Sequence, residues 1–389
     1  MRRRSAAVTA GPLMRRGPRP LLLHLTLAML KSNASATASP SLNAGLPQWN
    51  GAPAPDAALI AGIAAYRRHP WKRDLADPPV IWSEGETRML DYGGSGPCVL
   101  FVPSLVNRAQ VLDLMPDRSM LRAMAASGAA RVLLLDWGWP GAVECGFTLT
   151  DYIAGRLERA LLAAPSGLVL AGYCMGGLLA LAAAQRRPDR VAALALLATP
   201  WDFHAADPAR ATVLAGLLPR LEPLMALTRR LPVDALQTLF AMLDPEAIAD
   251  KYRRFGRIDQ DSDRARGFVA LEDWLNDGVP LAAPVARACL TDWYGANAPA
   301  RLAWRVAGQV IDPRSLAMPG FVAIPARDRI VPPESAAPLA TLIRGAVRHD
   351  AQAGHVGMVA GASARQALWQ PLLEWLGTLP SQRSGTQVD

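Results

Sequence analysis

The segment Gly167-Leu-Val-Leu-Ala-Gly-Tyr-Cys174-Met-Gly-Gly177 decides the fold class of this chain. Its first five residues are a continuous apolar run that is typical of a buried strand, and Leu178 to Gln185 has the pattern of a helix. Between them, glycines flank a cysteine in the layout of a nucleophile elbow, with cysteine in the place usually held by serine. The segment therefore predicts a strand, a sharp turn that carries a reactive thiol, and a helix.

The residue types around Cys174 fit such a turn. A nucleophile at its tip has a strained backbone, and side chains two residues to either side would collide, so Gly172 and Gly176 leave the needed room. The turn also points the N-terminus of the following helix at the sulfur, where the helix dipole favours a thiolate and a developing oxyanion. We expect Cys174 to be catalytic, and the alternative is a buried structural thiol.

Composition narrows the class of protein. The chain has 389 residues, 51% of them hydrophobic, which suits one large α/β domain with an insertion or two small domains. Its four cysteines are widely spaced and its five histidines are scattered, so we expect a reducing compartment, no disulfide framework and no metal site. The net charge of +8 is concentrated in six arginines before residue 20. The nearly neutral remainder argues against nucleic-acid binding.

The N-terminal region allows three interpretations. Arginines precede the apolar stretch Leu21 to Leu30, and Ala34-Ser-Ala36 offers a cleavage site, as in a signal peptide. The stretch is too short to span a membrane. The other two interpretations are a basic, apolar helix that lies on a lipid or polymer surface, and an arm without a fixed structure.

Strand-like and helix-like segments alternate through much of the remaining chain. Apolar runs predict five strands, which are Cys98–Val102, Arg131–Leu135, Gly167–Ala171, Val191–Leu197 and Gly320–Ile324. Helices are expected at several places, including Pro55–Arg68, Ser119–Ser127 and Thr150–Ala163. The segment Arg348-His349-Asp350 is interpreted as a solvated turn. This pattern predicts an α/β fold of the hydrolase type, a mostly parallel sheet with helices on both faces.

We divide the chain into five regions on this basis. A mostly helical stretch interrupts the alternation before the last strands, where an insertion is placed to cap the site. The regions are an N-terminal arm and linker (1–56), the first part of the core (57–204), a helical cap (205–315), the C-terminal part of the core (316–378) and a polar tail (379–389).

A thiol nucleophile needs a base, and the base needs an orienting group. In hydrolase-type sheets the order is nucleophile, acid, histidine, with the last two on loops after strands. Asp328 and His355 fit in order and placement. Among the rivals, His204 is a candidate lid hinge, substrate contact or base, His349 lies in the expected turn, and the other two histidines, His24 and His69, precede the sheet.

The oxyanion hole is expected to combine two backbone N–H groups. One belongs to Met175, directly after the nucleophile, and the other to the loop after Val102. Pro103 has no N–H, which leaves Leu105 or Val106, and we take Val106. Ser104 lies in no elbow and is not expected to be a nucleophile.

Several further motifs resemble those of the polyhydroxyalkanoate synthases, most closely their short, two-subunit type. They lie between about residues 80 and 375 and follow the family's order. They are Leu105-Val-Asn107-Arg108, Leu112-Asp113-Leu, Pro116-Asp-Arg118-Ser119, Asp136-Trp137-Gly138-Trp-Pro140, Leu149-Thr-Asp151-Tyr152-Ile, the elbow, Thr199-Pro200-Trp-Asp202-Phe203, Asp328-x-Ile-Val-Pro332 and Gly354-His355-Val-Gly357.

The resemblance implies transfer of (R)-3-hydroxyacyl groups from coenzyme A thioesters onto a growing polyester. Cys174 would carry the acyl chain as a thioester, His355 would deprotonate the thiol and the incoming hydroxyl, and Asp328 would orient His355 or assist the hydroxyl. The coenzyme A thioester is then a substrate, and no cofactor or metal is expected. The resemblance further implies a cytoplasmic protein, a polyester granule surface, a second, non-catalytic synthase subunit and a homo-oligomer.

Two other functions stay open at this stage. A thioesterase, esterase or polyester depolymerase would use the same triad, since only the access of water separates it from a synthase. A non-catalytic protein of granule surfaces, or a partner subunit, is the other alternative. The cap segment Asp273-Trp274-Leu-Asn276-Asp277-Gly-Val-Pro280 resembles the synthase family only in part.

Overall fold

The computed structural model describes residues 15–28, 56–242 and 247–380, and its main feature is an eight-stranded sheet. The strand order is β1-β2-β4-β3-β5-β6-β11-β12. The contacts β1–β2 and β2–β4 are antiparallel and all the others are parallel. The strands are Val80–Glu84 (β1), Thr87–Gly94 (β2), Cys98–Val102 (β3), Arg131–Asp136 (β4), Leu168–Tyr173 (β5), Val191–Leu197 (β6), Gly320–Pro325 (β11) and Val347–Ala351 (β12).

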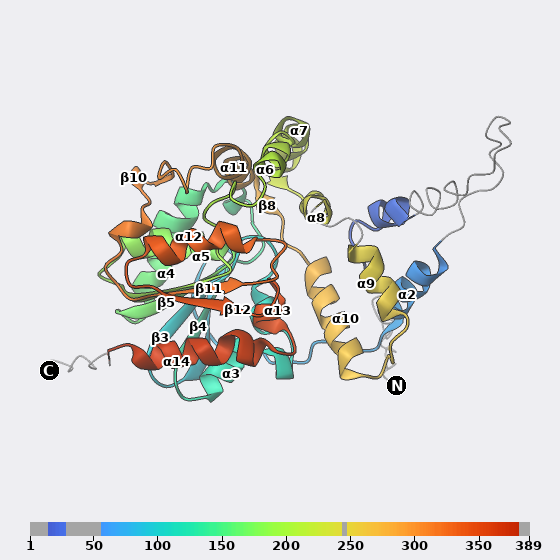
Figure 1. Cartoon of the computed structure of the whole chain (residues 1–389), viewed down its shortest axis with the longest axis horizontal. Helices are drawn as coiled ribbons and strands as arrows, with labels where there is room; N and C mark the ends of the chain where they lie inside the picture. Colours follow the sequence, from blue (N-terminus) through green and yellow to red (C-terminus); the bar gives the residue numbers. More distant parts are fainter. Residues whose placement is uncertain (1–14, 29–55, 243–246, 381–389) are drawn as a thin grey trace, which may run out of the picture. The chain divides into compact units, whose positions relative to one another are not determined.

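Helices cover both faces of this sheet (Figure 1). Helices α5 (Met175–Arg186) and α12 (Pro333–Leu342) lie on one face, and α3 (Met120–Ala126) and α14 (Gln370–Thr378) lie on the other. The central strands are therefore buried on both sides, which explains why they are continuous apolar runs rather than alternating ones. The predicted fold class is confirmed, and each of the five predicted strands is present with ends shifted by at most two residues.

The sheet extends further than the sequence pattern indicates. The interpretation of Arg348-His349-Asp350 as a turn is wrong, because these residues belong to β12, which pairs with β11 at the edge of the sheet. Charged, partly exposed side chains gave this edge strand no apolar signal. The helix predicted for Thr150–Ala163 is a π-helical segment, Asp151–Leu157, followed by α4, Glu158–Ala163.

The chain between β6 and β11 is largely helical. Its elements include α6 (Pro208–Ala215), α7 (Leu218–Thr228), α8 (Val233–Ala241), α9 (Ala247–Phe255), α10 (Asp263–Asn276), α11 (Ala283–Ala288), the π-helical segment Cys289–Gly295, and short strand pairs Arg230–Leu231 (β7) with Leu281–Ala282 (β8) and Arg305–Val306 (β9) with Gln309–Val310 (β10).

The chain divides into two compact units. One holds residues 73–243 and 277–389 and contains the sheet, whereas the other holds residues 1–72 and 244–276. The range predicted as one cap, 205–315, therefore contributes to both units. In the smaller unit, α2 (Ala57–Arg68) packs with α9 around the buried rings of Tyr66, Tyr252 and Phe255.

Part of the N-terminal prediction lies on described residues. Residues 21–28 are helical, with His24 and Ala28 buried. The candidate cleavage site Ala34-Ser-Ala36 and most of the expected arm and tail lie outside the described residues. Within the described part of the chain, no helix combines the length and the apolar character needed to cross a membrane.

Candidate functional site

Cys174 lies at a sharp turn between β5 and α5, at the carboxyl edge of the parallel strands. Its φ of 55° and ψ of −129° belong to a region that side-chain-bearing residues rarely adopt. The backbone N–H of Cys174 donates to the Leu197 carbonyl of β6 at 2.8 Å, which holds the strained residue in place. Because α5 begins at Met175, the partly exposed thiol faces the positive end of a helix.

Three glycines make this turn possible. A Cβ on Gly172 would meet the backbone of Gly176 and Gly177, and a Cβ on Gly176 would meet the backbone of the loop after β3, including the Pro103 carbonyl. A Cβ on Gly177 would strike the side chain of Thr199. The first two glycines play the part that the sequence assigned to them. The third has a role that only the structure shows.

Asp328 and His355 form a buried pair on the loops that follow β11 and β12. His355 Nδ1 lies 2.6 Å from Asp328 Oδ2, and the residues are 8% and 5% exposed. The other carboxylate oxygen, Oδ1, accepts the N–H groups of Ile330 and Val331 at 2.8 and 2.9 Å. With both oxygens bonded, the carboxylate cannot rotate freely, so it holds the imidazole with Nε2 on the side away from Asp328.

Cys174 acts on His355 as well, because it is among the groups that raise the pKa of the imidazole, and the three residues together form a Cys-His-Asp arrangement. Burial by itself would lower the pKa of His355, but the charge of the Cys174 thiolate and the Asp328 carboxylate raises it to about 10. Cys174 and Asp328 thus both favour the protonated form of His355. The three residues that the sequence nominated are brought together in one site, suited to deprotonating the thiol and returning the proton.

Tyr173 is a neighbour of this site that the sequence reasoning did not single out. Its hydroxyl donates to the His355 carbonyl at 3.3 Å, and the two rings lie 5.2 Å apart. Burial raises the pKa of the Tyr173 hydroxyl far above its ordinary value, so the group stays protonated and can donate this bond. The sequence feature that could have identified Tyr173 is its position directly before the nucleophile.

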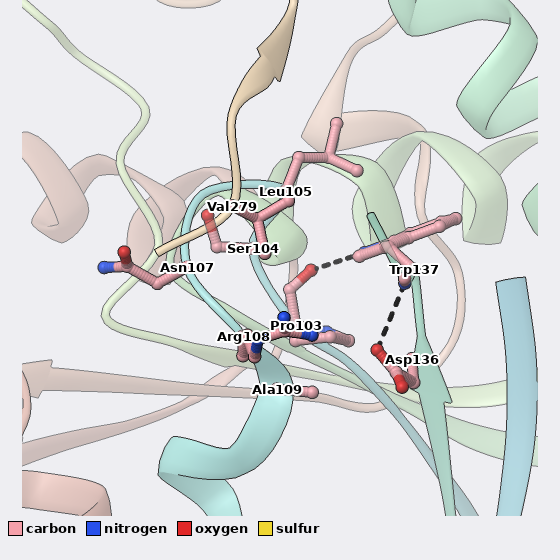
Figure 2. Close-up of a pocket in the computed structure, with 10 residues that line it drawn as sticks. Pro103, Ser104, Leu105, Asn107, Arg108, Ala109, Asp136, Trp137 and Val279 are labelled. Atoms are coloured by element: carbon pink, nitrogen blue, oxygen red, sulfur yellow. Dashed lines mark hydrogen bonds between the residues drawn. The ribbon is translucent and has the colours of Figure 1, made fainter. Parts of the chain in front are cut away.

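The expected oxyanion donors have different surroundings. Met175 is the first residue of α5, where helix N–H groups have no partner within the helix. The N–H of Val106 donates to the Ser104 hydroxyl at 3.0 Å, so it would have to leave that partner to bind an oxyanion. Trp137 steadies the same loop through its Nε1, which donates to the Pro103 carbonyl at 2.9 Å (Figure 2).

The rival histidines are held by backbone carbonyls. His204 Nε2 lies 2.7 Å from the Tyr294 carbonyl, which ties the segment after β6 to the helical insertion. His349 Nε2 lies 2.7 Å from the Ala367 carbonyl, and its ring stacks on Phe321. Asn297 strengthens the first of these connections, because its amide donates to Asp202 and accepts from the Phe203 N–H. Among the described residues, no three His, Cys, Asp or Glu side chains are grouped to hold a metal ion.

Comparison with known proteins agrees with this geometry. Residues 149–362 match the family model for the alpha/beta hydrolase fold, which is more than half of the chain. This chain belongs to the α/β-hydrolase family. Its matched region begins before the nucleophile turn and ends after His355, so the whole Cys-His-Asp arrangement lies within it.

Curated relatives narrow the resemblance within that family. The chain is 27% identical over 331 residues to the poly(3-hydroxyalkanoate) polymerase subunit PhaC of Haloferax mediterranei, covering 80% of this chain and 65% of that protein. It is also 27% identical over 288 residues to the subunit of the same name from Allochromatium vinosum, covering 72% of this chain and 80% of that protein. These relatives confirm the predicted resemblance to the polyhydroxyalkanoate synthase family, and the chain spans just under two thirds of the length of the first of them.

Proposed function

We propose that this α/β-hydrolase family member is an acyltransferase that polymerises (R)-3-hydroxyacyl-CoA into polyhydroxyalkanoate. The observation that carries the proposal is the Cys174–His355–Asp328 arrangement, with the thiol at the N-terminus of α5. The names of the relatives support the substrate class. Sulfur suits this chemistry, because exchange of an acyl group between two thioesters is nearly balanced in energy and leaves the group active toward a hydroxyl.

The first step is acyl transfer to the enzyme. The proton of Cys174 passes to His355, and the sulfur attacks the carbonyl carbon of the incoming thioester. When the tetrahedral intermediate breaks down, the bond from the carbonyl carbon to the coenzyme A sulfur breaks and His355 returns its proton to that sulfur. Met175 N–H, at the start of α5, is placed to stabilise the oxyanion. The products are a Cys174 thioester and free coenzyme A.

The second step extends the polymer. His355 takes the proton from the 3-hydroxyl of a second hydroxyacyl group, and that oxygen attacks the Cys174 thioester. An ester bond forms, the bond to the Cys174 sulfur breaks, and the proton returns to the thiol. Asp328 stabilises the imidazolium in both steps through its bond to Nδ1. The 3-hydroxyl must react with the Cys174 thioester in preference to water, so we assign the exclusion of water to the helical insertion after β6.

The same proposal covers partners and location. We infer that the substrate is a hydroxyacyl-CoA and that the product is a polyester. We also infer that the enzyme works in the cytoplasm at the surface of polyester granules. A second synthase subunit and a second copy of this chain are the inferred protein partners. The term "subunit" in the names of the relatives supports the partner subunit.

The experiment is incubation of the purified full chain with (R)-3-hydroxybutyryl-CoA, following coenzyme A release and the acyl product together. A Cys174→Ala variant is the control, and we expect it to release no coenzyme A above background. Release with accumulating polyester supports the synthase. Release with only free hydroxy acid, with and without an added partner subunit, would instead identify a thioesterase that uses the same triad.

A further inference from the structure

The nucleophile and its base come from strands that are not neighbours. Cys174 follows β5 and His355 follows β12, and β6 and β11 lie between these two strands in the sheet. Since adjacent strands are about 4.8 Å apart, β5 and β12 are separated by roughly 14 Å. The loop after β12 must therefore extend back across two strands to bring the imidazole to the thiol.

Asp328 and His355 are held to each other by the loops on which they lie. The N–H of Arg327, next to Asp328, donates to the Ala353 carbonyl at 3.0 Å. Together with the contact between His355 Nδ1 and Asp328 Oδ2, this bond joins the loops after β11 and β12. The acid and the base are thus placed relative to each other, and a further contact is needed to place the pair relative to the sulfur.

Tyr173 connects this pair to the strand of the nucleophile. It is the last residue of β5, directly precedes Cys174 and is 4% exposed. Its hydroxyl donates to the His355 carbonyl at 3.3 Å, and its ring lies 5.2 Å from the imidazole with 37° between the planes. Because the bond is made to the backbone of His355, it holds the loop and leaves both imidazole nitrogens available for chemistry.

The His355 carbonyl lies at a point where the backbone changes from loop to helix. Helix α13 (Gly357–Ala360) begins two residues later, and the bonds at its start are accepted by the carbonyls of Gly354 and Val356, on either side of His355. The Tyr173 hydroxyl is a partner for the carbonyl between them. Loss of this partner would favour a loop that moves until the carbonyl finds another one.

We propose that Tyr173 is a positioning residue that holds the histidine loop against the nucleophile turn. The strand end that carries the thiol then also carries the group that sets the distance from the sulfur to the imidazole, and the Asp328–His355 pair is kept from moving back toward β12. This assignment rests on the proposed function for the roles of Cys174 and His355, and it applies equally to a thioesterase with the same triad.

The test measures the electrostatic contact between Cys174 and His355. The full chain, Tyr173→Phe and Cys174→Ala are titrated by NMR with labelled histidine. Because Cys174 is one of the groups that raise the pKa of His355 to about 10, Cys174→Ala gives the titration of His355 without the thiol. We expect the Tyr173→Phe titration to lie between those of the wild type and Cys174→Ala. The kcat for coenzyme A release should fall about fivefold, the size of one hydrogen bond, with KM little changed.

Tyr92→Phe is the matched control. The Tyr92 hydroxyl donates to Asp113 Oδ2 at 3.1 Å in the same compact unit, from β2, which lies on the opposite side of β5 from β12. This variant should lose stability but keep the wild-type kcat and the wild-type titration of His355. A purely structural role for Tyr173 predicts the same behaviour for Tyr173→Phe, so an unshifted His355 titration there would overturn the proposal.

The same measurements separate this proposal from the proposed function. If Cys174→Ala leaves the His355 titration unchanged, the triad itself is contradicted, and the role of Tyr173 with it. If Cys174→Ala shifts the titration and Tyr173→Phe does not, only the positioning role is wrong. If both variants shift it but the wild-type chain makes only free hydroxy acid, the positioning role is kept and the synthase is refuted.

Discussion

Strands β3 and β5 are neighbours in the sheet, run in the same direction and end at the same edge, yet they present their functional groups differently. The turn after β5 is set mainly by backbone packing, because a Cβ on Gly172 or Gly176 would meet backbone atoms, and a Cβ on Gly177 would meet the side chain of Thr199. The loop after β3 is held mainly by side chains, through Trp137 on the Pro103 carbonyl and Ser104 on the Val106 N–H.

This difference separates two tasks. A nucleophile must keep one position through both acyl transfers, and a turn set by backbone contacts has no alternative arrangement of similar energy. An oxyanion donor such as the Val106 N–H must exchange its partner when an oxyanion forms, and a side-chain bond permits that exchange. We therefore expect substitutions after β5 to have large effects and substitutions after β3 to have graded ones.

The largest effect is expected when the Asp328 carboxylate is removed, which tests whether the turn after β5 can support catalysis without it. Asp328→Asn removes a negative charge that favours the His355 imidazolium, so the pKa of His355 should fall from its raised value toward 6.5. We expect coenzyme A release to drop by about a thousandfold or more while the fold is retained. The measurements are the rate of release and an NMR titration of labelled histidine.

The sign of the accompanying pH effect follows from the raised pKa. A proton held more tightly in the folded state adds stability that is complete below pH 6.5 and is lost as the pH rises through about 10. Asp328→Asn should lower the pH at which this stabilisation is lost. A His355 titration unchanged by the substitution would contradict the role of the carboxylate.

The second test compares the cysteine of each strand. Cys98 begins β3 and is 5% exposed, and burial raises the pKa of its thiol to about 11, so at pH 8 roughly one molecule in a thousand is a thiolate there. Cys174 follows β5 beside His355 at a helix N-terminus. We expect iodoacetamide to modify Cys174 at least about a hundredfold faster than Cys98. Peptide mass spectrometry at several reaction times measures the two rates. Similar rates for the two thiols would count against an activated nucleophile.

The same two strands show what the sequence could predict. The G-x-C-x-G-G turn, Asp328 and His355 were found because strand, turn and chain order each leave a local pattern. Gly177 against Thr199, Tyr173 on the His355 carbonyl and Trp137 on the Pro103 carbonyl join residues far apart in the chain, and no local pattern encodes them. Strand β12 was missed for a related reason, because an exposed edge strand has no apolar face to mark it.

The third test probes the packing behind the nucleophile. Gly177→Ala would place a methyl group against the buried side chain of Thr199, so we expect a loss of about 1–3 kcal/mol in the free energy of unfolding, together with reduced activity. Chemical denaturation measures the loss. Gly377→Ala in α14 is the control: nothing lies within 4 Å of its added Cβ, and alanine favours a helix, so stability should hold or rise. Equal stability of the two variants would disprove tight packing of the turn.

The smallest effect is expected after β3. Trp137→Phe keeps a buried ring but removes the bond from Nε1 to the Pro103 carbonyl, so we expect a loss of about 1 kcal/mol in stability and a severalfold lower kcat. Trp369→Phe is the matched control, since its Nε1 donates to the Val359 carbonyl at 3.0 Å from an equally buried ring. Both variants should lose similar stability, while the loss of kcat should be greater for Trp137. If the two variants lose the same activity, the Trp137 bond does not position the oxyanion loop, and the loop after β3 would need another explanation for its order.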